Sequence, residues 1–209
     1  MRSVAQGVEV AVDPRGVARP ERETLRTAAN AVTGVRTVAA VALAMLAARE
    51  ESLGLLLASL AVYWVGDIAD GTLARLTDHE TRIGATLDIL SDRFCAGAFY
   101  VGLAWLEPGL ALPIAIYLAE FMVVDAFLSL AFLAWPIVSP NYFYVVDHKL
   151  WLWNWSKLGK AVNSAAFAIL LVVTESVWLG TAVALALLTL KVASLVRLGR
   201  LGLPVPSGS

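Results

Sequence analysis

Long apolar segments alternate with short polar turns along most of the chain. These segments cover about residues 32–48, 52–75, 83–106, 110–135, 155–174 and 177–196. A helix needs about 20 mainly apolar residues to cross the hydrocarbon core of a membrane. The pattern therefore predicts an all-α polytopic membrane protein with six transmembrane helices.

The segments outside this pattern are more polar. Residues 1–20 contain glycine, proline and arginine but no apolar run, which predicts a mobile cytoplasmic tail rather than a cleaved signal peptide. Residues 21–29 suit a short amphipathic helix at the membrane surface. We therefore expect a tail and interfacial helix at residues 1–29, a six-helix domain at 30–200 and a C-terminal tail at 201–209. Residues 136–156 are rich in aromatic side chains, which favours an interfacial loop or surface helix.

The composition supports a membrane protein and excludes several other classes. Of the 209 residues, 59% are hydrophobic, and the mean hydropathy is +0.73; soluble domains are about 45–50% apolar. The net charge of −1 provides no attraction to nucleic acid. The single cysteine, Cys95, excludes an internal disulfide and any zinc site built from cysteines.

Basic residues are unevenly distributed between the two sides of the predicted bundle. The turns at residues 49–51, 107–109 and 175–176 contain one basic residue, Arg49, whereas the tails and the other loops hold most of the rest. Because cytoplasmic loops carry an excess of lysine and arginine, we expect both termini to face the cytoplasm. The preference for arginine over lysine indicates a GC-rich bacterial genome and hence a bacterial cytoplasmic membrane.

Four carboxylates interrupt the second and third apolar segments. They are Asp67, Asp70, Asp88 and Asp92. Spacings of three and four residues place each pair on one helix face. A charged side chain at the centre of a membrane helix costs about 2.5–3.5 kcal/mol, so four together need compensation, which Mg²⁺ or Mn²⁺ provides through oxygen ligands. Small residues at 71, 74 and 84 allow a close approach of helices or ligand. The pattern therefore predicts metal-assisted phosphoryl transfer at the membrane.

The full spacing carries a family resemblance. It reads Asp-x-x-Asp-Gly-x-x-Ala-Arg, eight residues, then Gly-x-x-x-Asp-x-x-x-Asp, over residues 67–92. This resembles the signature of the CDP-alcohol phosphotransferases, with every fixed position present. A weaker match lies at the first helix, where members begin with Pro-Asn, then Thr and Arg; here Asn30, Thr33 and Arg36 keep the spacing, and Ala29 replaces the proline. The resemblance implies displacement of CMP from a CDP-linked lipid or alcohol by a hydroxyl acceptor, and a homodimer.

Residue roles follow from the chemistry together with the resemblance. We expect two Mg²⁺ or Mn²⁺ ions, because four carboxylates around one ion would leave excess negative charge beside an anionic substrate. The expected metal ligands are Asp67, Asp70, Asp88 and Asp92. The resemblance assigns Asp92, the last aspartate, as the general base. The expected nucleotide contacts are Asp67, Asp70, Gly71, Ala74, Arg75, Gly84, Asn30 and Thr33.

The sequence leaves the acceptor open among several hydroxyl compounds. With CDP-diacylglycerol as donor, glycerol 3-phosphate is the leading acceptor, and phosphatidylglycerol and an inositol phosphate are the alternatives. Lys157, Lys160 and Arg82 are the candidate acceptor ligands, since cationic side chains bind phosphate. The Gly-Lys element at 159–160 and the residues 81–85 resemble the phosphatidylglycerophosphate and cardiolipin synthase branches, whereas Asp92-Arg93 is closer to the inositol-phosphate branch.

Two readings from other classes remain. The carboxylates could form a proton or cation relay in a small transporter, although a relay has no need of the small residues and the arginine of the signature. An inert assembly protein is disfavoured by the intact acidic set. Glu120, Asp125 and His148 are further polar groups whose orientation relative to the cavity the sequence does not determine.

Overall fold

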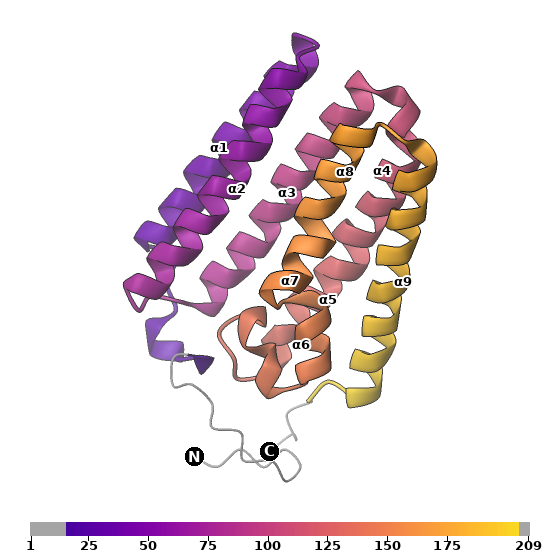
Figure 1. Ribbon diagram of the computed structural model, residues 1–209. Coiled ribbons are helices and arrows are strands. Elements are labelled where there is room, and N and C mark those ends of the chain that lie inside the picture. Colours follow the sequence, from indigo (N-terminus) through magenta and orange to yellow (C-terminus); the bar gives the residue numbers. More distant parts are fainter. Residues whose placement is uncertain (1–15, 205–209) are drawn as a thin grey trace.

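The structure is a computed structural model that describes residues 16–204 (Figure 1). Within this range, six helical spans are long and apolar enough to cross a membrane, which confirms the prediction. The first three are single helices, α1 (Ala28–Arg49), α2 (Leu53–Leu76) and α3 (Arg82–Leu106), and the sixth is α9 (Val177–Leu201). Residues 1–15 and 205–209 lie outside the described residues, and with them most of the two predicted tails.

The fourth and fifth spans are composite. The fourth runs through η3 (Pro108–Leu110), α4 (Ala111–Ala119), the π-helix η4 (Glu120–Asp125), α5 (Ala126–Leu130) and the 3-10 helix η5 (Ala131–Ala134). The fifth runs through α6 (His148–Asn154), α7 (Lys157–Lys160), the π-helix η7 (Ala161–Ala165) and α8 (Ala166–Thr174). It begins seven residues before the predicted start at 155, because the Asp147 side chain caps α6 by accepting from the Leu150 N–H at 2.8 Å.

Helix starts follow short capping side chains. The hydroxyl groups of Thr27, Ser52, Thr81, Ser156 and Ser176 each accept a backbone N–H of the first turn that follows. Such caps satisfy one of the four N–H groups that a helix start leaves without an intrahelical partner. The polar turns predicted between the apolar segments therefore end one helix and begin the next.

The amphipathic helix predicted for residues 21–29 is wrong. The structure has a 3-10 turn, η2 (Pro20–Arg22), followed by non-helical residues 23–27. The reason is that two side chains here cap other helices. The Glu23 carboxylate accepts the backbone N–H groups of Arg82 and Ile83 at 2.9 Å each and so caps α3, while Thr27 caps α1 in an extended conformation.

The spans pack as two adjoining groups (Figure 1). On one side α1 and α2 lie together and against α3, where buried alanines of α1 allow a close approach. On the other side α4 packs on α9, and stacked aromatic rings join α4 to α8: the Tyr117 and Phe167 centroids are 4.4 Å apart. Helix α3 contacts both groups, so its acidic face is held between them.

The aromatic segment at 136–156 forms a second core. It folds into the 3-10 helix η6 (Pro140–Val145) and α6, and Phe143 and Leu150 are fully buried against Phe132. Several of its aromatic residues therefore pack inside the protein, beyond the interfacial position that the sequence predicts.

Candidate functional site

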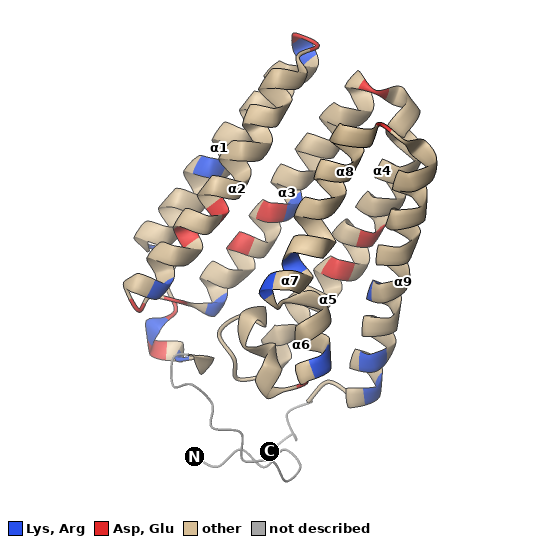
Figure 2. Ribbon diagram, viewed as in Figure 1, with Lys and Arg blue, Asp and Glu red and all other residues tan. Residues whose placement is uncertain are grey.

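Three carboxylates converge between α2 and α3. Single oxygens of Asp67 and Asp70, on α2, and of Asp88, on α3, all lie within 4.8 Å of one another. Figure 2 shows these acidic positions facing each other at similar heights in the bundle. Asp70 is buried, whereas the side chains of Asp67 and Asp88 are about 40% exposed, at 42% and 39%. The helix spacing that predicted shared faces thus produces one cluster that remains open to a ligand.

Arg36 of α1 reaches into this cluster. Its Nε donates to Asp70 Oδ2 at 2.7 Å, and its Nη2 donates to Asp88 Oδ1 at 2.6 Å and to Asp92 Oδ1 at 2.9 Å. Asp67 Oδ1 lies 3.7 Å from the same Nη2. This guanidinium also brings Asp92 into the cluster. In the sequence, Arg36 stands out only as one position of the first-helix element, and its spacing from Asn30 and Thr33 is the signal that points to it.

The charge balance fits divalent cations. Four carboxylates share one guanidinium, so three negative charges remain when all four aspartates are ionised. Hard cations such as Mg²⁺ and Mn²⁺ prefer carboxylate oxygen, and the three converging oxygens are a set that could hold such an ion.

Neighbouring residues direct Arg36 into this position. A Cβ added at Gly66 would lie 2.5 Å from both Cβ and Cδ of Arg36, so only glycine lets the arginine stem pass α2. The guanidinium carbon lies 5.6 Å from the Tyr63 ring centroid, within cation–π range. The Thr33 hydroxyl lies 2.7 Å from Asp70 Oδ2 and 3.1 Å from the Ala29 carbonyl, so the predicted residue Thr33 does lie beside the acidic cluster.

The other predicted nucleotide contacts lie nearer the end of the helices. A Cβ at Gly71 would lie 3.3 Å from the guanidinium of Arg75, which is exposed. A Cβ at Gly84 would lie 2.8 Å from Thr81 Oγ1 and 3.0 Å from Asn30 Oδ1. Gly84 therefore lets α1 and the cap of α3 approach closely, which is the close approach of helices expected from a small residue at this position. Ala74 is half-buried on α2.

The three candidate acceptor ligands differ in position. Lys157 and Lys160 are exposed on α7, and Lys160 interacts electrostatically with Asp67 and Asp88. Figure 2 shows the basic positions of α7 beside the acidic positions of α3. The Arg82 guanidinium instead bonds the Leu133 carbonyl at the end of η5. The structure thus brings Lys160 toward the acidic cluster and directs Arg82 to a neighbouring loop.

The polar groups left open by the sequence do not join this cluster. Asp125 is buried and paired with Arg93 at 2.5 Å and with Lys191 at 2.6 Å. Glu120 is 1% exposed in the same region, and its Oε1 has no hydrogen-bond partner among the described residues. His148 is exposed and lies against Trp151.

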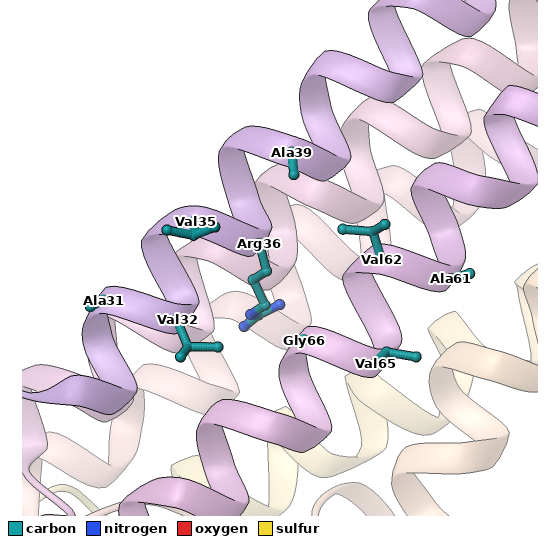
Figure 3. Close-up of a pocket in the computed structure, with 9 residues that line it drawn as sticks. All are labelled: Ala31, Val32, Val35, Arg36, Ala39, Ala61, Val62, Val65 and Gly66. Carbon is teal, nitrogen blue, oxygen red and sulfur yellow. The ribbon is translucent and has the colours of Figure 1, made fainter.

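An apolar cavity of about 610 Å³ lies between α1 and α2 (Figure 3). Its walls are alanine and valine side chains with Gly66, and among the described residues that line it Arg36 alone is charged. Figure 3 shows the Arg36 side chain passing between the two helices beside this space. An apolar space and the acidic cluster therefore meet at one residue.

Comparison with known proteins gives one family match. A protein-family model described as CDP-alcohol phosphatidyltransferase matches residues 26–194, which include α1 to α8 and most of α9. No curated protein and no solved structure matches the chain. The matched range contains the acidic cluster, Arg36 and both lysines of α7.

Proposed function

The chain belongs to the CDP-alcohol phosphatidyltransferase family, and on this premise we propose that it transfers the phosphatidyl group of CDP-diacylglycerol to a hydroxyl acceptor and releases CMP. This is the chemistry of enzymes that transfer substituted phosphate groups in phospholipid biosynthesis. The observation that carries the proposal is the convergence of Asp67, Asp70 and Asp88 within 4.8 Å. The family is a transferase family, which argues against the transporter alternative.

Divalent metal is the expected cofactor. The family uses divalent metal ions, and Asp67, Asp70 and Asp88, with Asp92 beside them, are the residues that would hold Mg²⁺ or Mn²⁺ here. We propose two ions, in keeping with the three unbalanced negative charges. When bound, they would neutralise charge on the phosphate oxygens of the donor.

Asp92 is proposed as the general base. It lies one turn after Asp88 on the same face of α3, and its Oδ1 is held by Arg36 at 2.9 Å. Asp92 would take the proton of the acceptor hydroxyl. The acceptor oxygen then bonds to the β-phosphorus, and the bond from that phosphorus to the bridging oxygen breaks, so CMP leaves with the bridging oxygen.

The substrates would occupy the two sides of the acidic cluster. We propose that the nucleotide binds along Asn30, Thr33, Gly71, Ala74, Arg75 and Gly84, and that Lys157, Lys160 and Arg82 bind the acceptor phosphate. The position of Lys160 near Asp67 and Asp88 supports a phosphorylated acceptor, with glycerol 3-phosphate first. Phosphatidylglycerol and an inositol phosphate are the alternatives. The apolar cavity beside Arg36 supports a lipid-linked donor.

The proposed setting is the cytoplasmic membrane of a bacterium. The acidic cluster and both termini would face the cytoplasm, where CDP-linked substrates are found, and the enzyme would act as a homodimer. The six-helix domain would cover residues 30–200, close to the range that the family model matches.

The test is CMP release by the purified protein. CDP-diacylglycerol and Mn²⁺ or Mg²⁺ are supplied with glycerol 3-phosphate, phosphatidylglycerol or an inositol phosphate, and with no acceptor as the control. We expect CMP with one acceptor only, and none after chelation of the metal. Absence of both CMP release and metal-dependent binding of CDP-diacylglycerol would refute the proposal.

A further inference from the structure

A second buried polar network lies on a different face of α3 from the acidic cluster. Arg93 follows Asp92 directly and is therefore turned by about 100° around the helix. Its Nη2 donates to Asp125 Oδ2 at 2.5 Å and to Ser129 Oγ at 3.0 Å, and its Nη1 donates to the Ile89 carbonyl at 2.9 Å. These bonds hold α3 in one rotation, with Asp92 directed toward α1 and α2.

The network continues to two further helices, α9 and α6. Lys191 of α9 donates to Asp125 Oδ1 at 2.6 Å and to Asn154 Oδ1 at 2.9 Å. Asn154, at the end of α6, donates to Ser194 Oγ at 3.0 Å and to the Leu150 carbonyl at 2.9 Å. The four residues Arg93, Asp125, Lys191 and Asn154, which we name the buried polar chain, are all buried.

Asn154 is the last residue of α6, and α6 packs directly against α7. A Cβ at Gly159 would lie 2.9 Å from the carbonyl oxygens of Leu152 and Trp153, so α7 packs directly on the end of α6. Asn163 Nδ2 donates to the Trp153 carbonyl at 2.9 Å and to the Gly159 carbonyl at 2.7 Å. A close backbone contact and the Asn163 hydrogen bonds therefore fix α7 against the end of α6.

Asp125, the acid of the buried polar chain, is the last residue of the π-helix η4. In a regular α-helix, residues 120 and 125 would point about 140° apart. The wider π-turn reduces this angle, so Glu120 is buried in the same region as Asp125, although only Asp125 forms an ion pair with Lys191 among the described residues. Turns of this kind occur often at functional sites. Removing charges from water is costly, and apolar residues of similar volume often stabilise a core equally well, so a buried ion network points to positional specificity.

We propose that the buried polar chain positions α7, with Lys160, relative to the Asp88–Asp92 face of α3. It joins the helix of the base to the helix of the acceptor ligand through side chains that touch no substrate. Its members are therefore positioning residues. The inference rests on the proposed function, in which Asp92 accepts the proton of a hydroxyl whose phosphate Lys160 binds.

The principal variant is the double substitution Asp125→Asn with Lys191→Met. It removes one negative and one positive charge, so the buried charge remains balanced. The second variant, Asn154→Leu, breaks the connection to α6 and leaves every ion pair intact. The matched control is Glu120→Gln, which converts a buried acid of the same π-turn that has no ion pair among those found in residues 16–204.

Turnover is measured with CDP-diacylglycerol, Mn²⁺ and whichever acceptor of the panel releases CMP with the wild-type protein. We expect the double variant to lower kcat per folded enzyme by about 100-fold, the size expected for a misplacement of about 1 Å. KM for the acceptor rises, Asn154→Leu shows a smaller loss of the same kind, and metal-dependent binding of CDP-diacylglycerol is unchanged. Glu120→Gln retains wild-type turnover.

A distance measurement separates this inference from the proposed function. Spin labels at Leu90→Cys on α3 and Leu158→Cys on α7, both exposed positions, are introduced in a Cys95→Ala background. We expect one narrow distance distribution with the buried polar chain intact and a broadened or shifted one in the double variant. An unchanged distribution, wild-type kcat in both variants, or an equal loss in Glu120→Gln would overturn the inference. A wild-type protein that releases no CMP would instead overturn the proposed function and leave the distance readout valid.

Discussion

Gly66→Ala tests how Arg36 organises the acidic cluster. The added Cβ would lie 2.5 Å from Cβ and Cδ of Arg36 and 3.0 Å from Cγ. Carbon atoms normally approach to about 3.5–4.0 Å, so the arginine stem must move by about 1 Å. Such a shift separates the guanidinium from at least one of Asp70, Asp88 and Asp92, which it now bonds at 2.6–2.9 Å.

The size of the effect follows from the bonds at risk. A hydrogen bond to a charged group contributes about 1.5–3 kcal/mol, so the loss of one bond in the reacting complex corresponds to about a 30-fold decrease in kcat. Overpacking of a helix contact also lowers the free energy of unfolding by about 1–3 kcal/mol. We therefore expect weaker turnover together with a lower thermal midpoint.

The assay is CMP release per folded enzyme, with the thermal midpoint measured on the same preparation. Gly34→Ala is the matched control, because a Cβ at this position of α1 meets no heavy atom within 4 Å. Wild-type turnover and stability in Gly66→Ala would contradict the conclusion that Gly66 lets the Arg36 side chain reach the acidic cluster. The effect must also depend on the arginine: in an Arg36→Gly background, which also removes the Cβ that the added methyl group would meet at 2.5 Å, Gly66→Ala is expected to cause no additional loss of turnover.

Three further predictions concern single carboxylates. Asp92→Asn is expected to bind CDP-diacylglycerol normally and to lose turnover, and CMP release at the wild-type rate would exclude Asp92 as the base. Asp67→Asn and Asp88→Asn are expected to weaken metal-dependent binding of CDP-diacylglycerol; an unchanged Mn²⁺ titration would contradict their role as ligands. At the end of the bundle, burial alone would raise the pKa of Asp147, but hydrogen bonds from Arg197 and the Leu150 N–H outweigh it and lower this pKa. A lowered folded-state pKa stabilises the fold above the unfolded-state pKa of about 4. This stabilisation is lost as the pH falls through the lower folded-state pKa. Asp147→Asn should thus lower the thermal midpoint at pH 7 and have little effect under strongly acidic conditions; an equal decrease at both pH values would contradict the ion-pair explanation.

Features that depend on local order along the chain were predictable from the sequence. Apolar length predicts six spans, and spacings of three and four residues predict that Asp67 pairs with Asp70 and Asp88 with Asp92 on single faces. The reason is that the helix period fixes which nearby residues share a face, and the membrane thickness fixes how long an apolar run must be. The same local reasoning failed at residues 21–29, because Glu23 caps a helix almost sixty positions away.

Which helix faces pack against each other is visible only in the tertiary structure. Periodicity places a residue on a face of its own helix but does not specify the helix opposite, so Arg36 appeared in the sequence as one position of a weak element. In the fold it donates to three of the four aspartates. Asp125 carried the same ambiguity, and its pairing with Lys191, 66 residues away, depends on the packing of distant helices. Contacts between distant residues are selected by the complementary shape and charge of complete helices, which no local pattern contains.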